Sequence, residues 1–225
     1  MCGRFTITLE AADLQQDLGV VDMPVDWQPR YNVAPTQPVA AVLDAGARRA
    51  EWLRWGLIPS WAKDPTIGSR LINARFETIT EKPSFRQAFA RRRCLILADG
   101  FYEWKRQADQ KGPSQPYYFQ RTDKKPFAFA GLWEIWKPPE GEVVRSCTII
   151  TCAANEVVAP VHERMPVILS GEMMWKWLEP GSSESLVGFL QPYPAQWMTS
   201  YPISRAVNDA NRESPDLVKG MGQTG

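Results

Sequence analysis

Residues 93–106 read RCLILADGFYEWKR, and this stretch carries the clearest structural signal in the sequence. Two apolar and aromatic runs, Arg93–Ala98 and Phe101–Arg106, flank the dipeptide Asp99-Gly100. Such runs are typical of β-strands, and glycine tolerates the positive φ that a tight turn requires. The stretch therefore predicts a β-hairpin.

Strand patterns continue on both sides of this stretch. They span Val39–Leu43, Glu51–Leu57, Pro116–Arg121, Pro126–Trp133, Val144–Cys152 and Met165–Leu169, while helical periodicity spans Leu9–Leu18, Ser84–Arg92, Asn155–Val161 and Glu172–Leu178. Many short strands with interspersed helices favour an α+β fold, which we expect to be a single domain of mostly antiparallel, barrel-like β-sheets with peripheral helices. The polar tail after Asn211 is expected to be ordered only in part.

The composition places little constraint on function. The chain has 225 residues, a mass of 25.5 kDa and a formal net charge of +1. A charge this balanced gives no overall attraction to nucleic acid, so a DNA-binding surface would have to be a local patch. The sequence has no signal-peptide pattern and no apolar run of membrane-spanning length, so we expect a cytoplasmic protein that does not bind membranes.

Neither a metal nor another cofactor is expected. The four cysteines stand at positions 2, 94, 147 and 152, and His162 is the single histidine. No second Cys or His pair accompanies Cys147 and Cys152, so the sequence does not predict a structural zinc site. Cytosolic thiols stay reduced, which also argues against a disulfide framework.

Cys2 is the first candidate for chemistry. Cytosolic processing removes an initiator Met when the next residue is small, so Cys2 would become the amino terminus. Its α-amine, with an ordinary pKa of about 7.7–8.0, and its thiol would then lie on adjacent carbons. An aldehyde forms an imine with such an amine, and the thiol adds to the imine to close a thiazolidine ring. The alternative is that Cys2 is simply a small buried residue.

Residues 71–78, with the sequence LINARFET, form the second candidate. In an extended segment, Asn73, Arg75 and Glu77 would share one face. An Asn beside an Arg can orient a substrate oxygen and hold a phosphate. The alternative is a half-exposed strand with a surface ion pair.

Glu103 and His162 are candidates for proton transfer. Glu103 stands among aromatic residues, where burial raises a carboxyl pKa and favours general acid–base work; the alternative is an exposed residue paired with Lys105. His162 stands at a predicted break between a helix and a strand, where sites tend to be built. The alternative is a structural histidine.

Six motifs follow one another in a specific order. They are MCGRF from Met1, RYNVAP from Arg30, WGLIPSW from Trp55, NAR from Asn73, ADGFYEW from Ala98 and HERMP from His162. In this order they resemble the SOS response-associated peptidase (SRAP) family, from residue 2 to about residue 208, and SRAVN from Ser204 resembles its final motif. Some relatives have two adjacent tryptophans where this chain has Trp61-Ala62, which predicts a weaker preference for single-strand/double-strand junctions.

The resemblance implies a sensor of abasic sites in single-stranded DNA that shields the lesion through a thiazolidine crosslink. Cys2 would supply the amine and the thiol, and Asn73 would hold the amino terminus or the sugar. Glu103 would act as the acid–base in ring opening and imine formation, and His162 would contact the opened sugar and shuttle protons. The further DNA contacts implied by the resemblance are Arg4, Pro35, Trp61, Arg75, Thr151 and Arg164. We expect a monomer that associates with the nucleoid on damaged DNA.

Three alternatives remain open. The first is a cysteine-type autopeptidase or N-terminal-nucleophile hydrolase, in which Cys2 attacks an amide, His162 is the base and Asn73 polarises the carbonyl. The second is a noncovalent reader of modified bases, and the third is a purely structural module. A strand-cleaving lyase activity through the imine and Glu103 is compatible with the crosslinking hypothesis.

Overall fold

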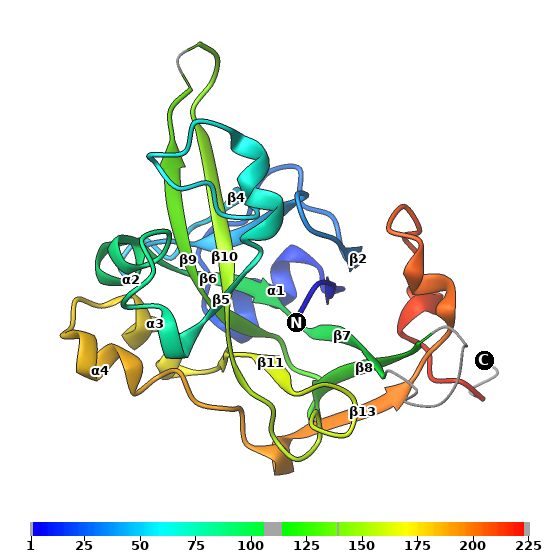
Figure 1. The fold of residues 1–225 in the computed structure, drawn as a ribbon. Coiled ribbons are helices and arrows are strands. Elements are labelled where there is room, and N and C mark those ends of the chain that lie inside the picture. The colour runs from blue at the N-terminus through cyan, green and yellow to red at the C-terminus, as the bar shows by residue number, and fades with distance from the viewer. Residues whose placement is uncertain (1, 106–113, 139, 223–225) are drawn as a thin grey trace.

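Five strands close into a barrel at the centre of the computed structural model, which describes residues 2–105, 114–138 and 140–222 (Figure 1). They are β3 (Pro38–Val42), β4 (Ala50–Trp55), β6 (Arg93–Ala98), β9 (Phe127–Trp136) and β10 (Val144–Ala153). Pairing runs in the order β10-β4-β3-β6-β9, and β9 pairs with β10 to close the ring. Only the β4–β10 pair is parallel within this ring. All residues of β6 are buried, as expected for a strand covered on both faces.

Three short strands extend the barrel sheet. β5 (Asn73–Arg75) runs parallel to β10, and β11 (Arg164–Pro166) runs antiparallel to it. Thr151 of β10 lies opposite Arg75 on one side and Pro166 on the other. β12 (Ile168–Leu169) pairs with β9. The strand β10 therefore fixes β5 and β11, which are far apart in the sequence, relative to each other.

A second, antiparallel sheet packs beside the barrel. Its order is β13-β8-β7-β1-β2, with β1 (Phe5–Ile7), β2 (Arg30–Val33), β7 (Gly100–Lys105), β8 (Gln115–Arg121) and β13 (Met198–Pro202). Phe5 joins the two sheets, because its ring meets Trp55 and Phe129 of the barrel edge-on at centroid distances of 5.2 and 5.5 Å. The amino terminus consequently lies in the middle of the molecule, by β5 and β7 (Figure 1).

The predicted hairpin at Asp99-Gly100 is wrong, although both of its strands exist. β6 pairs with β3 and β9 in the barrel, whereas β7 pairs with β1 and β8 in the second sheet. Asp99 marks the point where the chain passes from one sheet to the other. Gly100 is needed here for space, because a Cβ on it would lie 2.1 Å from the hydroxyl oxygen of Tyr118.

The helices are short and lie outside the barrel (Figure 1). The α-helices are α1 (Ala11–Leu18), α2 (Arg86–Arg91), α3 (Glu172–Leu178) and α4 (Ser183–Val187), and the 3-10 helices are η1 (Pro65–Arg70), η2 (Phe76–Thr78), η3 (Ala195–Trp197), η4 (Arg205–Asn208) and η5 (Pro215–Val218). No helix in the described part of the chain is long and apolar enough to cross a membrane.

The helix predicted at residues 155–161 is also wrong. The segment forms turns, because the side chain of Asn155 accepts hydrogen bonds from the backbone N–H groups of Val157 and Val158 at 3.1 and 3.0 Å. Pro160 follows and has no N–H with which to extend a helix. The side chain of Asn155 therefore replaces helical hydrogen bonds with a local turn.

The remaining strand predictions are confirmed, with boundaries that shift by a few residues. The predicted strand Met165–Leu169 is divided between β11 and β12, and Arg106, the predicted last residue of its strand, lies outside the described residues. The tail after Asn211 contains η5, in which Leu217 is buried against Tyr102 and Tyr118. A buried leucine thus anchors a segment that its polar composition predicted to be only partly ordered.

Candidate functional site

Cys2 is completely buried, and the strand that follows it is held firmly in place. The carboxylate of Asp99 accepts hydrogen bonds from the Thr6 hydroxyl and from the Thr8 backbone N–H, both at 2.5 Å. Together with the packing of Phe5 in the barrel, these bonds fix β1 and hence the position of Cys2. Burial raises the pKa of the Cys2 thiol far above its usual range, and the charge of Glu103 raises it further.

Asn73 contacts Cys2 directly. Its Nδ2 donates a hydrogen bond of 2.8 Å to the Cys2 carbonyl oxygen. Its Oδ1 is buried and has no hydrogen-bond partner among the described residues. β5 supplies this side chain in a fixed position, because Asn73 lies opposite Ile149 of β10. A buried acceptor without a donor is costly, so the Oδ1 atom is a site where an incoming N–H group would be stabilised.

Glu103 is buried rather than exposed, with a relative exposure of 3%. Gly100 to Glu103 of β7 are all buried and only Lys105 is exposed, so the predicted alternative of a surface pair between Glu103 and Lys105 is wrong. Burial raises the pKa of Glu103 to about 7. Because Glu103 in turn affects the thiol of Cys2, the two groups interact electrostatically. The site therefore holds a carboxyl group able to give or take a proton near neutral pH.

His162 follows a turn and stands two residues before Arg164 in the sequence. Its Nδ1 accepts a hydrogen bond of 3.0 Å from the Arg164 backbone N–H, and the Arg164 carbonyl oxygen lies 3.2 Å from the same nitrogen. A neutral ring can accept from the N–H, and a charged ring can donate to the carbonyl. His162 also lines a pocket of about 320 Å³ with Trp104 and Lys105, the residues that follow Glu103.

Arg75, Thr151 and Arg164 are brought together by the pairing of β5 and β11 with β10. Arg164 Nη2 donates to the Thr151 carbonyl oxygen at 2.7 Å and lies 3.3 Å from the Thr151 hydroxyl. Arg75 lies opposite Thr151 and is exposed. Glu77 forms an ion pair with Arg164. Glu77 does not continue the face of Asn73 and Arg75, because the chain turns into η2 at Phe76.

Arg4 has a structural role in addition to any contact with DNA. Its Nη1 donates to Asn32 Oδ1 at 2.7 Å and to the Val207 carbonyl oxygen at 2.8 Å. Asn208, from the same final motif, accepts a hydrogen bond of 2.8 Å from Trp104 Nε1. The SRAVN motif therefore supports the amino-terminal segment and the pocket beside His162.

Pro35 and Trp61 lie on loops next to β4. The Thr36 N–H donates to the Trp55 carbonyl oxygen at 2.8 Å, which fixes the loop that contains Pro35. Trp61 has a relative exposure of 58%, and the neighbouring Ala62 carbonyl oxygen accepts a hydrogen bond from Trp136 Nε1. An exposed indole on an anchored loop is available for stacking on a base. No hydrogen bond among the described residues joins Pro35 or Trp61 to Cys2. Their contact with DNA therefore stays a prediction.

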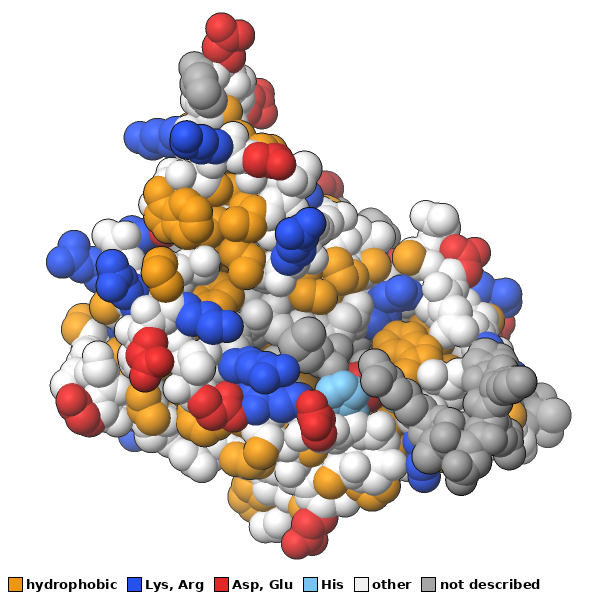
Figure 2. Space-filling model, in the orientation of Figure 1, with side chains coloured by type: hydrophobic (Ala, Val, Ile, Leu, Met, Phe, Trp, Pro, Cys, Tyr) orange, Lys and Arg blue, Asp and Glu red, His pale blue; other side chains and the backbone are white. Residues whose placement is uncertain are grey.

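The face that carries the amino terminus is rich in cations. In Figure 2, Lys and Arg side chains gather around the middle of this face, next to the pale blue histidine and with acidic side chains among them. The net charge of the chain is only +1, so the attraction of DNA would have to come from a local patch such as this one.

Sequence reasoning missed several residues that shape the site. Asn32 is buried and holds Arg4, and Asp99 was interpreted as a turn residue although it accepts hydrogen bonds from β1. Both stand inside motifs, and a polar residue inside an apolar motif was the signal that could have identified them. Glu77 was assigned to the face of Arg75 but not to the site.

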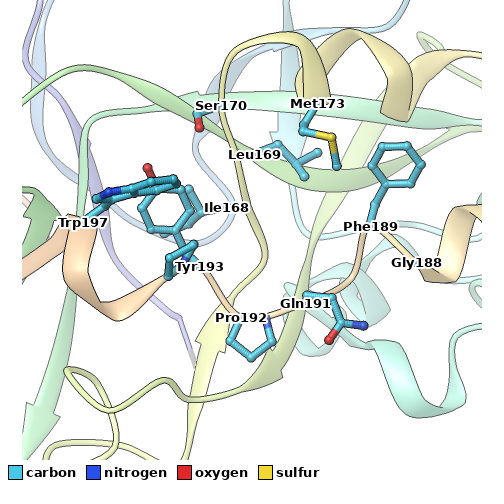
Figure 3. A pocket seen from close by; sticks show the side chains of 11 residues that line it. Ile168, Leu169, Ser170, Met173, Gly188, Phe189, Gln191, Pro192, Tyr193 and Trp197 are labelled. Carbon is cyan, nitrogen blue, oxygen red and sulfur yellow. The ribbon is translucent and has the colours of Figure 1, made fainter.

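A separate apolar pocket of about 310 Å³ lies between β12, α3 and the loop that leads to β13 (Figure 3). It is lined by Leu169, Met173, Phe189, Tyr193 and Trp197, among others, and contains none of the predicted site residues. Within the described residues, no group of three or more His, Cys, Asp or Glu side chains is arranged to hold a metal ion.

The amino-acid sequence is similar to curated proteins along almost its whole length. It is 45% identical over 224 residues to the abasic site processing protein YoqW of Bacillus subtilis, covering 97% of this chain and 99% of the relative. It is 33% identical over 263 residues to the abasic site processing protein HMCES of Xenopus tropicalis, covering 98% of this chain and 78% of the relative.

Solved structures have the same fold. A protein from Bacteroides thetaiotaomicron superposes with a TM-score of 0.77 at 29% identity, covering 85% of each chain. A protein from Bordetella bronchiseptica superposes with a TM-score of 0.77 at 25% identity, covering 90% of this chain and all of the other. The family model described as SOS response associated peptidase (SRAP) matches residues 1–210. The chain therefore belongs to the SRAP family.

Proposed function

We propose that this protein captures abasic sites in single-stranded DNA by forming a covalent bond through Cys2 once Met1 has been removed. The observation that carries the proposal is the burial of Cys2 between the Asn73 carboxamide and the carboxyl group of Glu103. The names of the relatives, abasic site processing proteins, agree with it. An abasic site is partly present as a ring-opened aldehyde, which is the electrophile that an aminothiol traps.

The amine reacts first and the thiol second. The α-amine of Cys2 attacks the aldehyde carbon, and loss of water gives an imine. The thiol then adds to the imine carbon, its proton passes to nitrogen, and a thiazolidine ring results. Burial keeps the thiol protonated, which matches a mechanism in which the amine is the initial nucleophile. Positioning the aldehyde beside Cys2 makes both steps effectively unimolecular.

Glu103 and Asn73 support these steps in different ways. With a pKa of about 7, Glu103 can protonate the departing hydroxyl and then accept the proton of the thiol. The Oδ1 atom of Asn73 is available to accept a hydrogen bond from the Cys2 amine, which would orient the nitrogen lone pair. As a carboxylate, Glu103 could also take a proton from the sugar carbon next to the imine carbon; a carbon–carbon double bond forms there, the bond to the 3′-phosphate breaks, and the strand is cleaved.

His162 and the arginines would hold the opened sugar and its phosphates. The ring of His162 has backbone partners for both of its protonation states, as a proton shuttle needs. Arg75 and Arg164 lie on either side of Thr151, so phosphates on both sides of the lesion can be contacted from one short surface. We expect single-stranded DNA, bound by a monomer, to be the substrate.

The alternative is a cysteine-type autopeptidase, an activity in line with the family's description. A thiol hydrolase depends on a thiolate, whose pKa a neighbouring imidazolium normally lowers. Burial raises the pKa of Cys2 instead. Autocatalytic removal of Met1 therefore stays secondary in this proposal. Cleavage of an unstructured protein that disappears on alkylation of Cys2 would favour the hydrolase.

The decisive experiment mixes processed protein with an oligonucleotide that carries one abasic site and separates the products on a denaturing gel. We expect a slow band that survives heat and detergent with the wild-type protein, and no band with an undamaged oligonucleotide. Cys2→Ala should lose this band but recover it when borohydride reduces the imine, because the α-amine remains. No band from wild-type protein whose first residue is verified as Cys2 would refute the proposal.

A further inference from the structure

Glu77 lies among the arginines that face the DNA in the proposed function. Its carboxylate forms a two-pronged ion pair with Arg164, in which Nη2 and Oε2 are 3.0 Å apart. Arg164 is the main cause of the lowered pKa of Glu77, and the charge of Arg75 contributes to it. Glu77 is therefore an anion that is bound to one of the predicted phosphate contacts, Arg164.

The carboxylate covers the outer side of the Arg164 guanidinium. The side chain of Arg164 is 11% exposed, whereas that of Glu77 is 43% exposed. On its inner side, Arg164 is anchored to Thr151 through the carbonyl oxygen at 2.7 Å. Thr151 is fully buried in β10, so this anchor stays when Glu77 moves. The Arg164 guanidinium is thus held on its inner side by the Thr151 carbonyl oxygen, and on its outer side by the Glu77 carboxylate, which another anion can replace.

A phosphate and the Glu77 carboxylate would compete for the same N–H groups. Each of these anions presents two oxygens that a guanidinium can bind through two parallel hydrogen bonds. A partly exposed ion pair contributes little stability, so a DNA phosphate can displace it at a small cost. That cost is the same for damaged and undamaged DNA, because both carry the same phosphates. Only damaged DNA offsets it by reacting with Cys2.

We propose that Glu77 speeds the release of the protein from undamaged single strands by competing with phosphate for Arg164. This inference rests on the proposed function. The protein dissociates readily from DNA without an aldehyde, and it remains where Cys2 forms a bond. Glu77 thereby shortens the time that the protein spends on undamaged DNA, whereas the covalent bond to Cys2 retains it at the lesion.

The test measures the affinity of Glu77→Gln and Glu77→Ala for an undamaged single-stranded oligonucleotide across a NaCl series by fluorescence anisotropy. Both variants should bind several-fold more tightly than wild type at low salt. The slope of log affinity against log salt should steepen by roughly 0.7 for each phosphate gained. Glu81→Gln is the matched control, because it removes the same charge from an exposed neighbour, and it should change affinity far less.

A competition assay supplies the second readout. When the protein is first bound to an excess of undamaged strand and the abasic oligonucleotide is added afterwards, Glu77→Gln should form its adduct more slowly than wild type, because release from the undamaged strand comes first. Binding by the Glu77 variants that equals Glu81→Gln, or that is weaker than wild type, would overturn the inference and make Glu77 a support for Arg164. If wild type itself neither binds nor crosslinks, the proposed function fails instead. Melting curves establish that each variant is folded.

Discussion

At the residue scale, the environment of a side chain decides its chemistry more than its identity does. Glu103 illustrates this, because the motif around it predicted either a surface ion pair or an acid–base group. The two outcomes depend on whether another part of the chain covers the face of β7 that carries Glu103, and the pattern of residues in one strand does not contain that information. In the folded chain the Glu103 carboxyl group is buried, and this burial raises its pKa.

Glu103 should make stability depend on pH. In the unfolded chain its pKa is the ordinary 4.5, and in the native state it is about 7. Between these values the unfolded state releases a proton that the folded state retains, so stability falls as pH rises and then levels off. Glu103→Gln cannot titrate, and its melting temperature relative to wild type should increase from pH 4.5 to pH 7. A difference that is constant across this range would contradict the assignment.

The same variant should slow crosslinking by roughly 100-fold or more, the usual effect of losing a positioned acid–base group. The measurement is the single-turnover rate of adduct formation on an abasic oligonucleotide. Noncovalent affinity for an undamaged strand should be unchanged, since Glu103 is buried and does not face the phosphates. A parallel loss of affinity would mean that the substitution disturbs the DNA surface.

Asn73→Ala should slow crosslinking by about tenfold, which corresponds to the loss of a single orienting hydrogen bond. The physical reason is that Nδ2 of Asn73 fixes the Cys2 carbonyl group and hence the direction of the amine. The rate of adduct formation is compared with that of Asn211→Ala, an exposed asparagine outside the site. Equal rates for the two variants would remove Asn73 from the mechanism.

At the scale of elements, local patterns predicted where strands lie but not which strands pair. The strands on both sides of Asp99-Gly100 were identified from their apolar residues, yet each has partners elsewhere in the chain. A turn signal describes local backbone preference, whereas pairing depends on the burial of whole faces. The helix predicted at residues 155–161 failed for a related reason, since the side chain of Asn155 outweighs apolar periodicity.

Gly100→Ala tests the interpretation of the crossover between the sheets. The added methyl group would lie within 2.1–2.6 Å of the Tyr118 ring and hydroxyl, so the protein should lose about 1–3 kcal/mol or more of stability, as overpacked cores do. Chemical denaturation gives this free energy of unfolding. Gly46→Ala is the control, because Gly46 is exposed and its nearest neighbour is the flexible Asp44 side chain. Similar losses for both variants would contradict the close contact.

At the scale of the whole molecule, the positive charge is local: the net charge is only +1, yet Lys and Arg side chains gather around the middle of the face shown in Figure 2. The family resemblance supplied the identities of the arginines in advance, whereas composition alone gave no indication of DNA. What no sequence pattern contained was the set of internal partners, such as Asn32 for Arg4 and Thr151 for Arg164.

Salt should therefore weaken DNA binding in proportion to a small number of contacts. If Arg4, Arg75 and Arg164 each neutralise one phosphate, log affinity for a single strand should fall against log salt with a slope of about −2. Arg75→Gln should reduce the magnitude of this slope by roughly 0.7. Arg49→Gln is the control, since Arg49 is exposed and paired with Asp22. A slope that Arg75→Gln leaves unchanged would place the phosphates elsewhere.

The burial of Cys2 also depends on strands that are synthesised long after Cys2 itself. During translation the amino terminus leaves the ribosome first, but β7, which pairs with β1, follows about a hundred residues later. At roughly 5–20 residues per second, the nascent chain has an accessible amino terminus for several seconds. Once β5 and β7 are in place, Cys2 has no exposed surface. The growing polypeptide therefore gives a processing enzyme several seconds of access to this end of the chain before Cys2 is enclosed.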